Sequence, residues 1–217
     1  MNKIKTFFVL IPFVFLSCAG NNIYSELLRN FQNLITEPED ITIEVVNSIP
    51  YASMQVRLGR TQNTLIVLEE VQGEILKWTS SNLVKIYTRN GFIVRFTGLE
   101  NQLDNVELDK RHPIITGNFS NQIDEFTSFY TFNNPKLFRL PINTRLKFIK
   151  NDKVNILGKT INTKLYEESS LDNLISWRFK NSYWVDDNGD IIQSHQTFTP
   201  LNPEIRIKIT NKYKKPE

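Results

Sequence analysis

The stretch "LVKIYTRNGFIVRF", from Leu83 to Phe96, indicates the fold class most directly. Two arms rich in β-branched and aromatic residues flank the dipeptide Asn90-Gly91. Asn-Gly supplies the two positive-φ residues of a type I′ turn, whose twist matches that of an antiparallel strand pair. We therefore expect a hairpin here, and further strands joined by short turns would make an antiparallel sheet.

Most of the chain beyond residue 40 also has the pattern of strands. Alternating apolar residues occur in three segments, "ITIEVV" (41–46), "SMQVRLG" (53–59) and "EIRIKIT" (204–210). The run "TLIVLEEV" (64–71) is continuously apolar at its start, which is typical of a strand that is buried on both faces or covered by a helix.

Two later segments predict further hairpins. "YWVDDNGDIIQSHQTF" (183–198) repeats the turn signal at Asn188-Gly189. "RLKFIKNDKVNILGKTINTKLYEE" (145–168) predicts two strands that turn near Asn151-Asp152. A polar connection around Asp104 to Pro113 and a helical turn at Ser170 to Trp177 are the expected exceptions.

One helix is expected, from Asn22 to Ile35, because Ile23, Leu27 and Phe31 recur at helical spacing. With about ten strands, the fold is predicted to be mainly β. A sheet of that size curls or splits, so we expect a large curved antiparallel sheet, as a half-barrel or a sandwich, with one N-terminal helix.

The N-terminus has the features of an export signal. Lys3 and Lys5 form a short basic start, and Thr6 to Leu16 is an uncharged apolar run. That run is shorter than the roughly 20 residues of a membrane-spanning helix, and Pro12 would weaken a permanent helix. Residues 1–17 are therefore predicted to be a signal peptide, and residues 18–217 a single β-rich domain.

Leu16-Ser17-Cys18 distinguishes between two kinds of signal. A small residue directly before the only cysteine of the chain resembles the lipobox of bacterial lipoproteins, although Phe15 departs from the usual leucine. In that family the thiol receives a diacylglyceryl group, the chain is cut before the cysteine, and the new amine is acylated. An aspartate directly after the cysteine is the signal that retains such lipoproteins in the inner membrane. Residue 19 is alanine instead, which favours the outer membrane.

Cys18 is thus predicted to be the lipidation site, with a covalent lipid and no other cofactor. Several acyl chains hold a protein firmly, since each buried CH₂ contributes about 0.8 kcal/mol. We expect a periplasm-facing domain anchored to the outer membrane of the cell envelope. No other thiol remains for a disulfide, a nucleophile or a metal site.

Motifs for catalysis and nucleic-acid binding are missing from the sequence. The net charge is only +3 and is spread along the chain, so no nucleic-acid partner is expected. The two histidines, His112 and His195, are predicted to be surface or half-buried polar residues, since no G-x-S-x-G or H-E-x-x-H motif accompanies them.

Acidic clusters have a structural explanation as well as a catalytic one. "DDNGD" at Asp186 to Asp190 lacks the spacing of a calcium loop and fits a turn, so no metal is expected. Adjacent carboxylates, such as Glu69-Glu70 and Glu167-Glu168, point to opposite faces of a strand unless the chain bends there.

The aromatic segment "FTSFYTFNNPKLF" (126–138) permits two interpretations. Phe126, Tyr130 and Phe132 share one face of a strand and could stack on sugar rings. Core packing is the favoured interpretation, because Phe has no polar group and is seldom left exposed.

Several of these segments, in this order, resemble the YjbF family of bacterial lipoproteins, which includes the lipoproteins of group 4 capsule gene clusters. They are the lipobox at Cys18, "IPYASM" (49–54), the Arg57-Leu58 strand, Lys77-Trp78, the Asn90-Gly91 hairpin, "NSYWVDDNGDIIQSHQ" (181–196) and "PEIRIKIT" (203–210). The resemblance is weakest from about Asp104 to Leu171. It implies a large antiparallel sheet similar in outline to periplasmic lipoprotein carriers, and it transfers a role only to Cys18.

Three functions remain open from the sequence. The first is binding in the export or assembly of a capsular or extracellular polysaccharide, with polysaccharide or export proteins as partners. The second is a lipid or lipoprotein carrier with an apolar cavity lined by residues such as Phe92, Val94 and Phe96. The third is a polysaccharide-modifying enzyme, which would need two carboxylates close together in a cleft.

Overall fold

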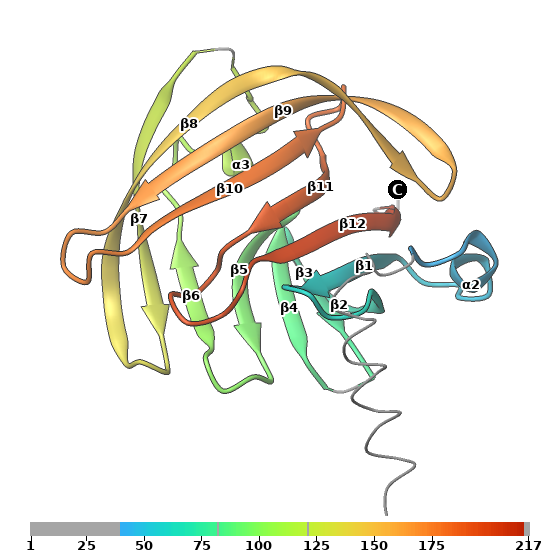
Figure 1. The fold of residues 1–217 in the computed structure, drawn as a ribbon, viewed down its shortest axis with the longest axis horizontal. Coiled ribbons are helices and arrows are strands. Elements are labelled where there is room, and N and C mark those ends of the chain that lie inside the picture. The colour runs from blue at the N-terminus through green and yellow to red at the C-terminus, as the bar shows by residue number, and fades with distance from the viewer. Residues whose placement is uncertain (1–39, 82, 121, 215–217) are drawn as a thin grey trace, which may run out of the picture. The chain divides into compact units, whose positions relative to one another are not determined.

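The computed structural model describes residues 40–81, 83–120 and 122–214 (Figure 1). Within these residues twelve antiparallel strands form a closed barrel. The elements in chain order are α2 (Ile43–Asn47), β1 (Ser53–Leu58), β2 (Thr64–Gln72), β3 (Ile75–Thr79), β4 (Lys85–Arg89), β5 (Phe92–Thr97), β6 (Leu103–Glu107), α3 (Pro113–Thr116), β7 (Asp124–Phe132), β8 (Leu137–Ile156), β9 (Lys159–Leu171), β10 (Arg178–Val185), β11 (Ile191–Gln196) and β12 (Ile205–Asn211).

Each strand pairs with its neighbours in sequence, and β1 pairs with β12 to close the sheet. Val56 lies opposite Ile207 at this junction. The predicted mainly β, antiparallel class is confirmed, and the predicted curling goes as far as closure. Closure removes the two sheet edges, whose unpaired N–H and C=O groups would otherwise invite pairing with another chain.

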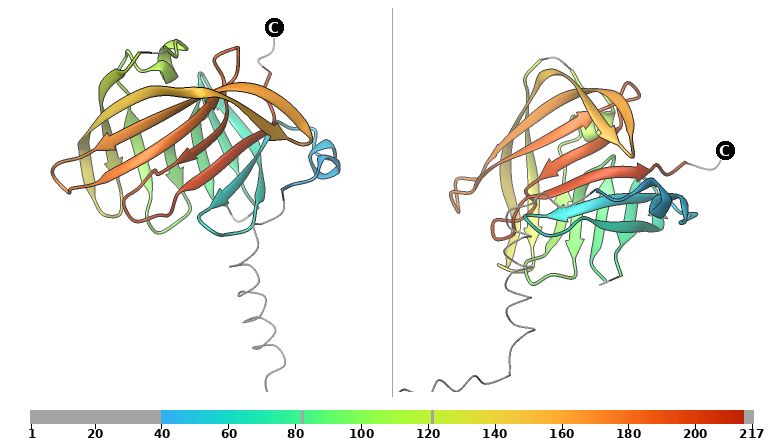
Figure 2. Two further views of the ribbon diagram at one scale, coloured as in Figure 1. Left: turned by 45° about the horizontal axis from the view of Figure 1, so that its top comes forward. Right: turned by 45° about the vertical axis from the view of Figure 1, so that its right-hand side comes forward.

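Alternate hairpins lie at opposite ends of the barrel. Rim A is formed by the connections at 59–63, 80–81 with 83–84, 98–102, 133–136, 172–177 and 197–204. Rim B is formed by those at 73–74, 90–91, 108–120 with 122–123, 157–158 and 186–190. In the left view of Figure 2 the hairpins of rim A lie along the lower edge of the barrel.

The interior of the barrel is filled with apolar side chains. Trp78, Phe92, Phe96, Phe132 and Tyr183 are among the largest side chains that are fully buried. On β7 the buried residues alternate with exposed or half-buried ones, and Phe126, Tyr130 and Phe132 all face inward. The core interpretation is therefore confirmed for these three residues, whereas Phe138 at the end of the segment is 80% exposed.

The Asn90-Gly91 turn agrees with the prediction, whereas two other turns do not. Asn90 and Gly91 have φ values of +43° and +77°, as a type I′ turn requires. At Asn188-Gly189 only Gly189 has a positive φ, and the connection is a wider loop from Asp186 to Asp190.

The turn predicted near Asn151-Asp152 is wrong. β8 runs through these residues with only a bulge between Phe148 and Lys150, and it turns at Leu157-Gly158. The N–H of Gly158 donates to Asn155 Oδ1 at 3.0 Å, which closes the actual turn.

Four other local predictions also need correction. The predicted strand at 41–46 contains α2, and the polar connection from Asp104 contains most of β6. The 170–177 segment continues β9 to Leu171 and then bends without a helix. In β2 only Ile66 is buried, so this strand is not covered on both faces.

The predicted helix at Asn22–Ile35 and the predicted signal peptide lie outside the described residues. Among the residues that the structure does describe, neither helix is long and apolar enough to cross a membrane.

Candidate functional site

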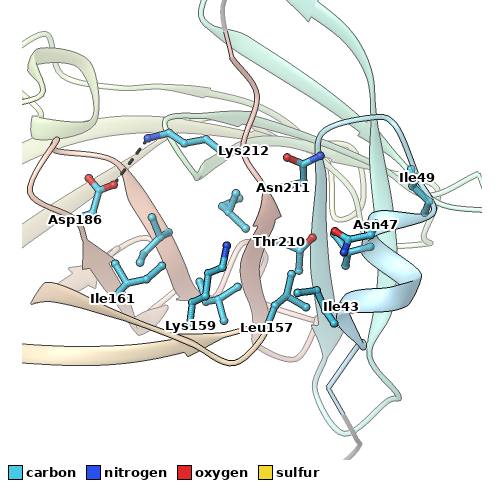
Figure 3. Close-up of a pocket in the computed structure, with 14 residues that line it drawn as sticks. Ile43, Asn47, Ile49, Leu157, Lys159, Ile161, Asp186, Thr210, Asn211 and Lys212 are labelled. Atoms are coloured by element: carbon cyan, nitrogen blue, oxygen red, sulfur yellow. Dashed lines mark ion pairs between the residues drawn. The ribbon is translucent and has the colours of Figure 1, made fainter.

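The main candidate site is a pocket of about 500 Å³ beside rim B (Figure 3). It lies between α2, the tip of the β8–β9 hairpin and the end of β12. Its apolar lining includes Ile43, Val46, Ile156, Ile161, Ile192 and Ile209. Ile156 and Ile192 belong, with Val154, to a small apolar cluster separate from the main core, so the pocket has a packed floor.

Polar side chains surround this apolar floor. They are Asn47, Lys159, Asp186, Thr210, Asn211 and Lys212. In Figure 3 the ammonium group of Lys159 extends between Ile161 and Thr210. Lys159 is exposed and forms no ion pair with a carboxylate in the described part of the chain, so its charge is available to a bound group.

A second pocket of about 280 Å³ lies next to the first. It is bordered by the β2–β3 and β4–β5 turns, including Glu74 and Asn90, and by Tyr213. Ile192, Ile209 and Lys212 line both pockets, which therefore share a wall. We call the two together the double pocket.

Lys212 is held in this shared wall by two carboxylates. Its Nζ lies 3.8 Å from Asp186 Oδ2 and also pairs with Asp190. Asp186 Oδ1 accepts hydrogen bonds from the N–H groups of Asn188 and Asp190, both at 2.9 Å. The turn interpretation of "DDNGD" is thus confirmed, because one oxygen of Asp186 organises the loop and the other faces an ammonium group.

The donor set of the double pocket suits binding better than acid–base chemistry. Asp186 and Asp190 both pair with the ammonium group of Lys212, so these carboxylates are already engaged. The described carboxyl groups whose pKa is lowered lie outside the double pocket; they are Asp40, Glu44, Glu69, Glu70, Asp109, Asp152 and Glu168. In the same part of the chain no cluster of three or more His, Cys, Asp and Glu side chains could hold a metal.

A second polar cluster lies inside the barrel, around Glu168. Glu168 Oε2 accepts from Asn181 Nδ2 at 2.8 Å and from the hydroxyl of Tyr183. His112 reaches in from rim B, and its Nε2 lies 3.7 Å from Glu168 Oε1, which is too far for a hydrogen bond. All four side chains are at most 2% exposed.

The charge state of Glu168 follows from these contacts. Burial alone would raise the pKa of this carboxyl group, but interactions with His112, Tyr183 and Asn181 outweigh burial and lower it. Next to this carboxylate, burial and the negative charge raise the pKa of Tyr183 well above its ordinary value. Glu168 is therefore a carboxylate that accepts hydrogen bonds, and none of these four side chains lines either pocket.

This cluster was not predicted, because His112 was expected to be a surface or half-buried polar residue. His112 is 1% exposed, packs on Phe92 and Phe126, and caps α3 by accepting the Ile114 N–H at Nδ1. "HP" before an apolar pair is a signal for a helix start that could have been read.

His195 agrees with its prediction as a half-buried polar residue. Its Nδ1 lies 3.9 Å from Glu204 Oε1, and its ring packs against Trp184. Burial lowers the pKa of His195, and the neighbouring cations Arg206, Arg57 and Lys208 lower it further, against the opposing effect of Glu204.

The adjacent carboxylates follow the predicted alternation at one position and not at the other. Glu167 faces outward to Lys180, while Glu168 faces the interior. At Glu69-Glu70 a bulge bends the strand, and both carboxylates bind Lys77, at 2.8 and 3.2 Å. This is the exception that the prediction allowed for, since the chain bends at Glu69-Glu70.

The side chains expected to line a carrier cavity are packed. Phe92, Val94 and Phe96 are 2%, 7% and 2% exposed, and Phe96 stacks on Phe198 with 4.3 Å between ring centroids. None of the three lines the double pocket. Cys18, the predicted lipidation site, lies outside the described residues.

Comparisons with known proteins agree with this fold. Residues 20–210 match a family model described as "Group 4 capsule polysaccharide lipoprotein gfcB, YjbF". The chain is 23% identical over 174 residues to the "Uncharacterized lipoprotein GfcB" of Escherichia coli K12, covering 78% of this chain and 81% of the relative. The crystal structure of the hypothetical lipoprotein YmcC from E. coli K12 superposes with a TM-score of 0.69 at 19% identity, over 87% of this chain and 97% of that one.

Proposed function

Because the chain belongs to the YjbF family of group 4 capsule polysaccharide lipoproteins, we propose that it takes part, by binding, in the export or assembly of a capsular or extracellular polysaccharide. In this proposal the mature protein begins at Cys18 and is anchored by its acyl groups to the outer membrane, facing the periplasm. Its relatives carry the word lipoprotein in their descriptions, which supports a place in the cell envelope.

The double pocket is the observation that carries the proposal. Its apolar floor suits the C–H faces of sugar rings, and its amide and hydroxyl groups suit sugar hydroxyls. The unpaired ammonium group of Lys159 adds affinity for an acidic sugar, since a charged hydrogen bond is stronger than a neutral one.

Deleting the gene and measuring surface polysaccharide tests this function. We expect the deletion to lower cell-surface polysaccharide and the wild-type gene to restore it. Lys159→Glu, which reverses the charge in the pocket, and Ile161→Trp, which fills its floor, should restore it poorly. Lys164→Glu is the matched control, because Lys164 is exposed on the same strand and lies outside the pocket.

A direct measurement complements the genetic one. The polysaccharide isolated from the producing cells is titrated against the purified protein, and Lys159→Glu should weaken binding while Lys164→Glu should not. If surface polysaccharide is unchanged by deletion wherever the gene is expressed, the proposed function is wrong. The packing argues against the carrier alternative, because the side chains predicted to line its cavity fill the core.

A further inference from the structure

Large apolar side chains stand exposed in, or close to, four of the hairpin connections of rim A. Leu83, Phe138, Leu174 and Leu201 are 74%, 80%, 75% and 60% exposed. They come from the β3–β4, β7–β8, β9–β10 and β11–β12 hairpins, so they are spread around one end of the barrel. Single exposed apolar residues are ordinary, but these four are among the five most exposed large apolar side chains of the described residues, and they share one end of the barrel.

Rim A is a packed surface, so these side chains are not displaced core residues. Asn202 Nδ2 donates to the carbonyl oxygen of Asn101 at 2.8 Å, and the N–H of Gly59 donates to the carbonyl oxygen of Glu204 at 2.7 Å. Trp177 stacks on Phe179 with 4.1 Å between ring centroids. The two hydrogen bonds link the β1–β2, β5–β6 and β11–β12 hairpins, and the ring contact packs the β9–β10 hairpin against its own strand.

The exposed, unpaired charges at this end of the barrel are mainly positive. Arg60 and Lys136 on rim A and Arg178, the first residue of β10, are exposed, and none forms an ion pair with a carboxylate in the described residues. Of the rim A carboxylates that the structure describes, Glu100 is exposed, Asp172 is buried, and the half-buried Glu204 pairs with Arg206. Apolar tips surrounded by unpaired cations match the chemistry of a lipid surface, which offers anionic phosphates above an apolar layer.

The start of the described chain lies near this rim. Asp40 Oδ1 accepts hydrogen bonds from Gln55 Nε2 at 2.8 Å and from Asn63 Nδ2, in the β1–β2 hairpin, at 3.5 Å. Asp40 is 22 positions after Cys18 (40 − 18), a length that spans up to roughly 75 Å when extended. A tether this long does not fix which face of the barrel meets the membrane.

We propose that rim A lies on the membrane surface, with Leu83, Phe138, Leu174 and Leu201 inserted at the level of the lipid headgroups. Arg60, Lys136 and Arg178 then lie near lipid phosphates. The distance from Cys18 to Asp40 matters only if the proposed lipid anchor at Cys18 is correct. The exposed apolar and basic side chains of rim A do not depend on that anchor. Docking by rim A would leave the β4–β5 and β10–β11 turns of rim B, which border the double pocket, on the side away from the bilayer.

Binding to vesicles of phosphatidylethanolamine and phosphatidylglycerol tests this surface. The chain from residue 18 carries Cys18→Ser, so that no acyl group holds it, and its fraction floating with vesicles is measured. Replacing Leu83, Phe138, Leu174 and Leu201 by serine should lower partitioning at least roughly tenfold. A control with Val71→Ser, Ile123→Ser and Ile149→Ser removes exposed apolar side chains outside rim A and should have little effect.

A site-specific probe provides a second measurement, which does not require the variant with four serine substitutions to fold. Cys18→Ser leaves the chain without cysteine, so Leu174→Cys or Ile123→Cys can carry one polarity-sensitive dye. Vesicles should shift the emission of the dye to the blue at 174 and not at 123.

Three outcomes would overturn the proposal. They are the absence of vesicle binding, equal binding by the serine variant and the control, and equal shifts at both dye positions. A shift at 174 that depends on protein concentration without vesicles would assign rim A to a second copy instead. A failed polysaccharide test with normal vesicle binding would reject the proposed function alone.

Discussion

The hydroxyl group of Tyr183 donates a hydrogen bond to Glu168 Oε2 in the interior of the barrel, where both side chains are at most 1% exposed. The two residues lie on neighbouring strands, β10 and β9, which pair in register through Asn181 opposite Glu168. A buried carboxylate is costly unless its hydrogen bonds are satisfied, so this contact is a requirement of the core.

Removing the Tyr183 hydroxyl should destabilise the barrel. Tyr183→Phe keeps the ring in place but leaves Glu168 with one donor fewer, at an expected cost of about 1 to 3 kcal/mol in the free energy of unfolding. Urea denaturation measures this cost. Tyr87→Phe is the control, because the half-buried Tyr87 ring lies beside Arg95 and away from Glu168. Equal losses in both variants would contradict the role of the contact.

Acid should destabilise the protein partly through Glu168. The pKa of this group is lower in the folded chain than its ordinary value of 4.5. Above 4.5 the group is ionised in both states and its full contribution to stability is present. As the pH falls below 4.5, the unfolded chain binds the proton first, and the contribution is lost as the pH passes the folded pKa.

The variant Glu168→Gln cannot titrate at this position, so its stability should fall less steeply below pH 4.5 than that of the wild type. Some slope should remain, because the pKa of Asp109 is also lowered, to about 2, by its hydrogen bonds to Arg111. Unfolding is followed by circular dichroism at several pH values. Parallel curves for the two proteins would show that Glu168 contributes no pH dependence.

Two glycines with the same backbone angle should respond differently to alanine. Gly91 and Gly158 both have φ of +77°, which costs alanine about 1 kcal/mol. A Cβ at Gly91 would also lie 2.8 Å from the Cβ of Ile191, whereas nothing lies within 4 Å at Gly158. Chemical denaturation should therefore show a larger loss for Gly91→Ala. Similar losses would mean that rim B relaxes freely around Ile191.

Lipidation of Cys18 is testable in cells. Cys18→Ser removes the sulfur that would receive the diacylglyceryl group, so labelled palmitate should no longer be incorporated and lipoprotein-type cleavage should stop. Gel mobility and metabolic labelling follow both steps. A variant that is still acylated and still fractionates with the outer membrane would show that the N-terminus was misinterpreted.

Local signals explain which parts of the fold were predicted. The Asn90-Gly91 turn could be predicted because Asn-Gly readily adopts two adjacent positive φ angles, which a type I′ turn requires. The turn at Leu157-Gly158 was missed because Asn151-Asp152 has an equally good composition, and only the long β8–β9 ladder carries the chain past it. The alternation at 41–46 was interpreted as a strand, but these residues, which include most of α2, pair with no strand of the described sheet.

The double pocket and the cluster around Glu168 could not be predicted from the sequence. Lys159 and Lys212 meet at one pocket only because the ends of β9 and β12 come together. His112 meets Glu168 only because the segment before α3 reaches into the barrel. Neither pairing has a sequence spacing from which it could be read.

The sequence by itself determined an antiparallel, mainly β chain and the family to which it belongs, because turns and alternation act between residues close in the chain. Only the tertiary structure decided that β1 meets β12, that Glu168 is satisfied by Tyr183, and that exposed apolar tips gather on rim A. These features depend on pairing between distant segments, and hence on which face of each strand is buried.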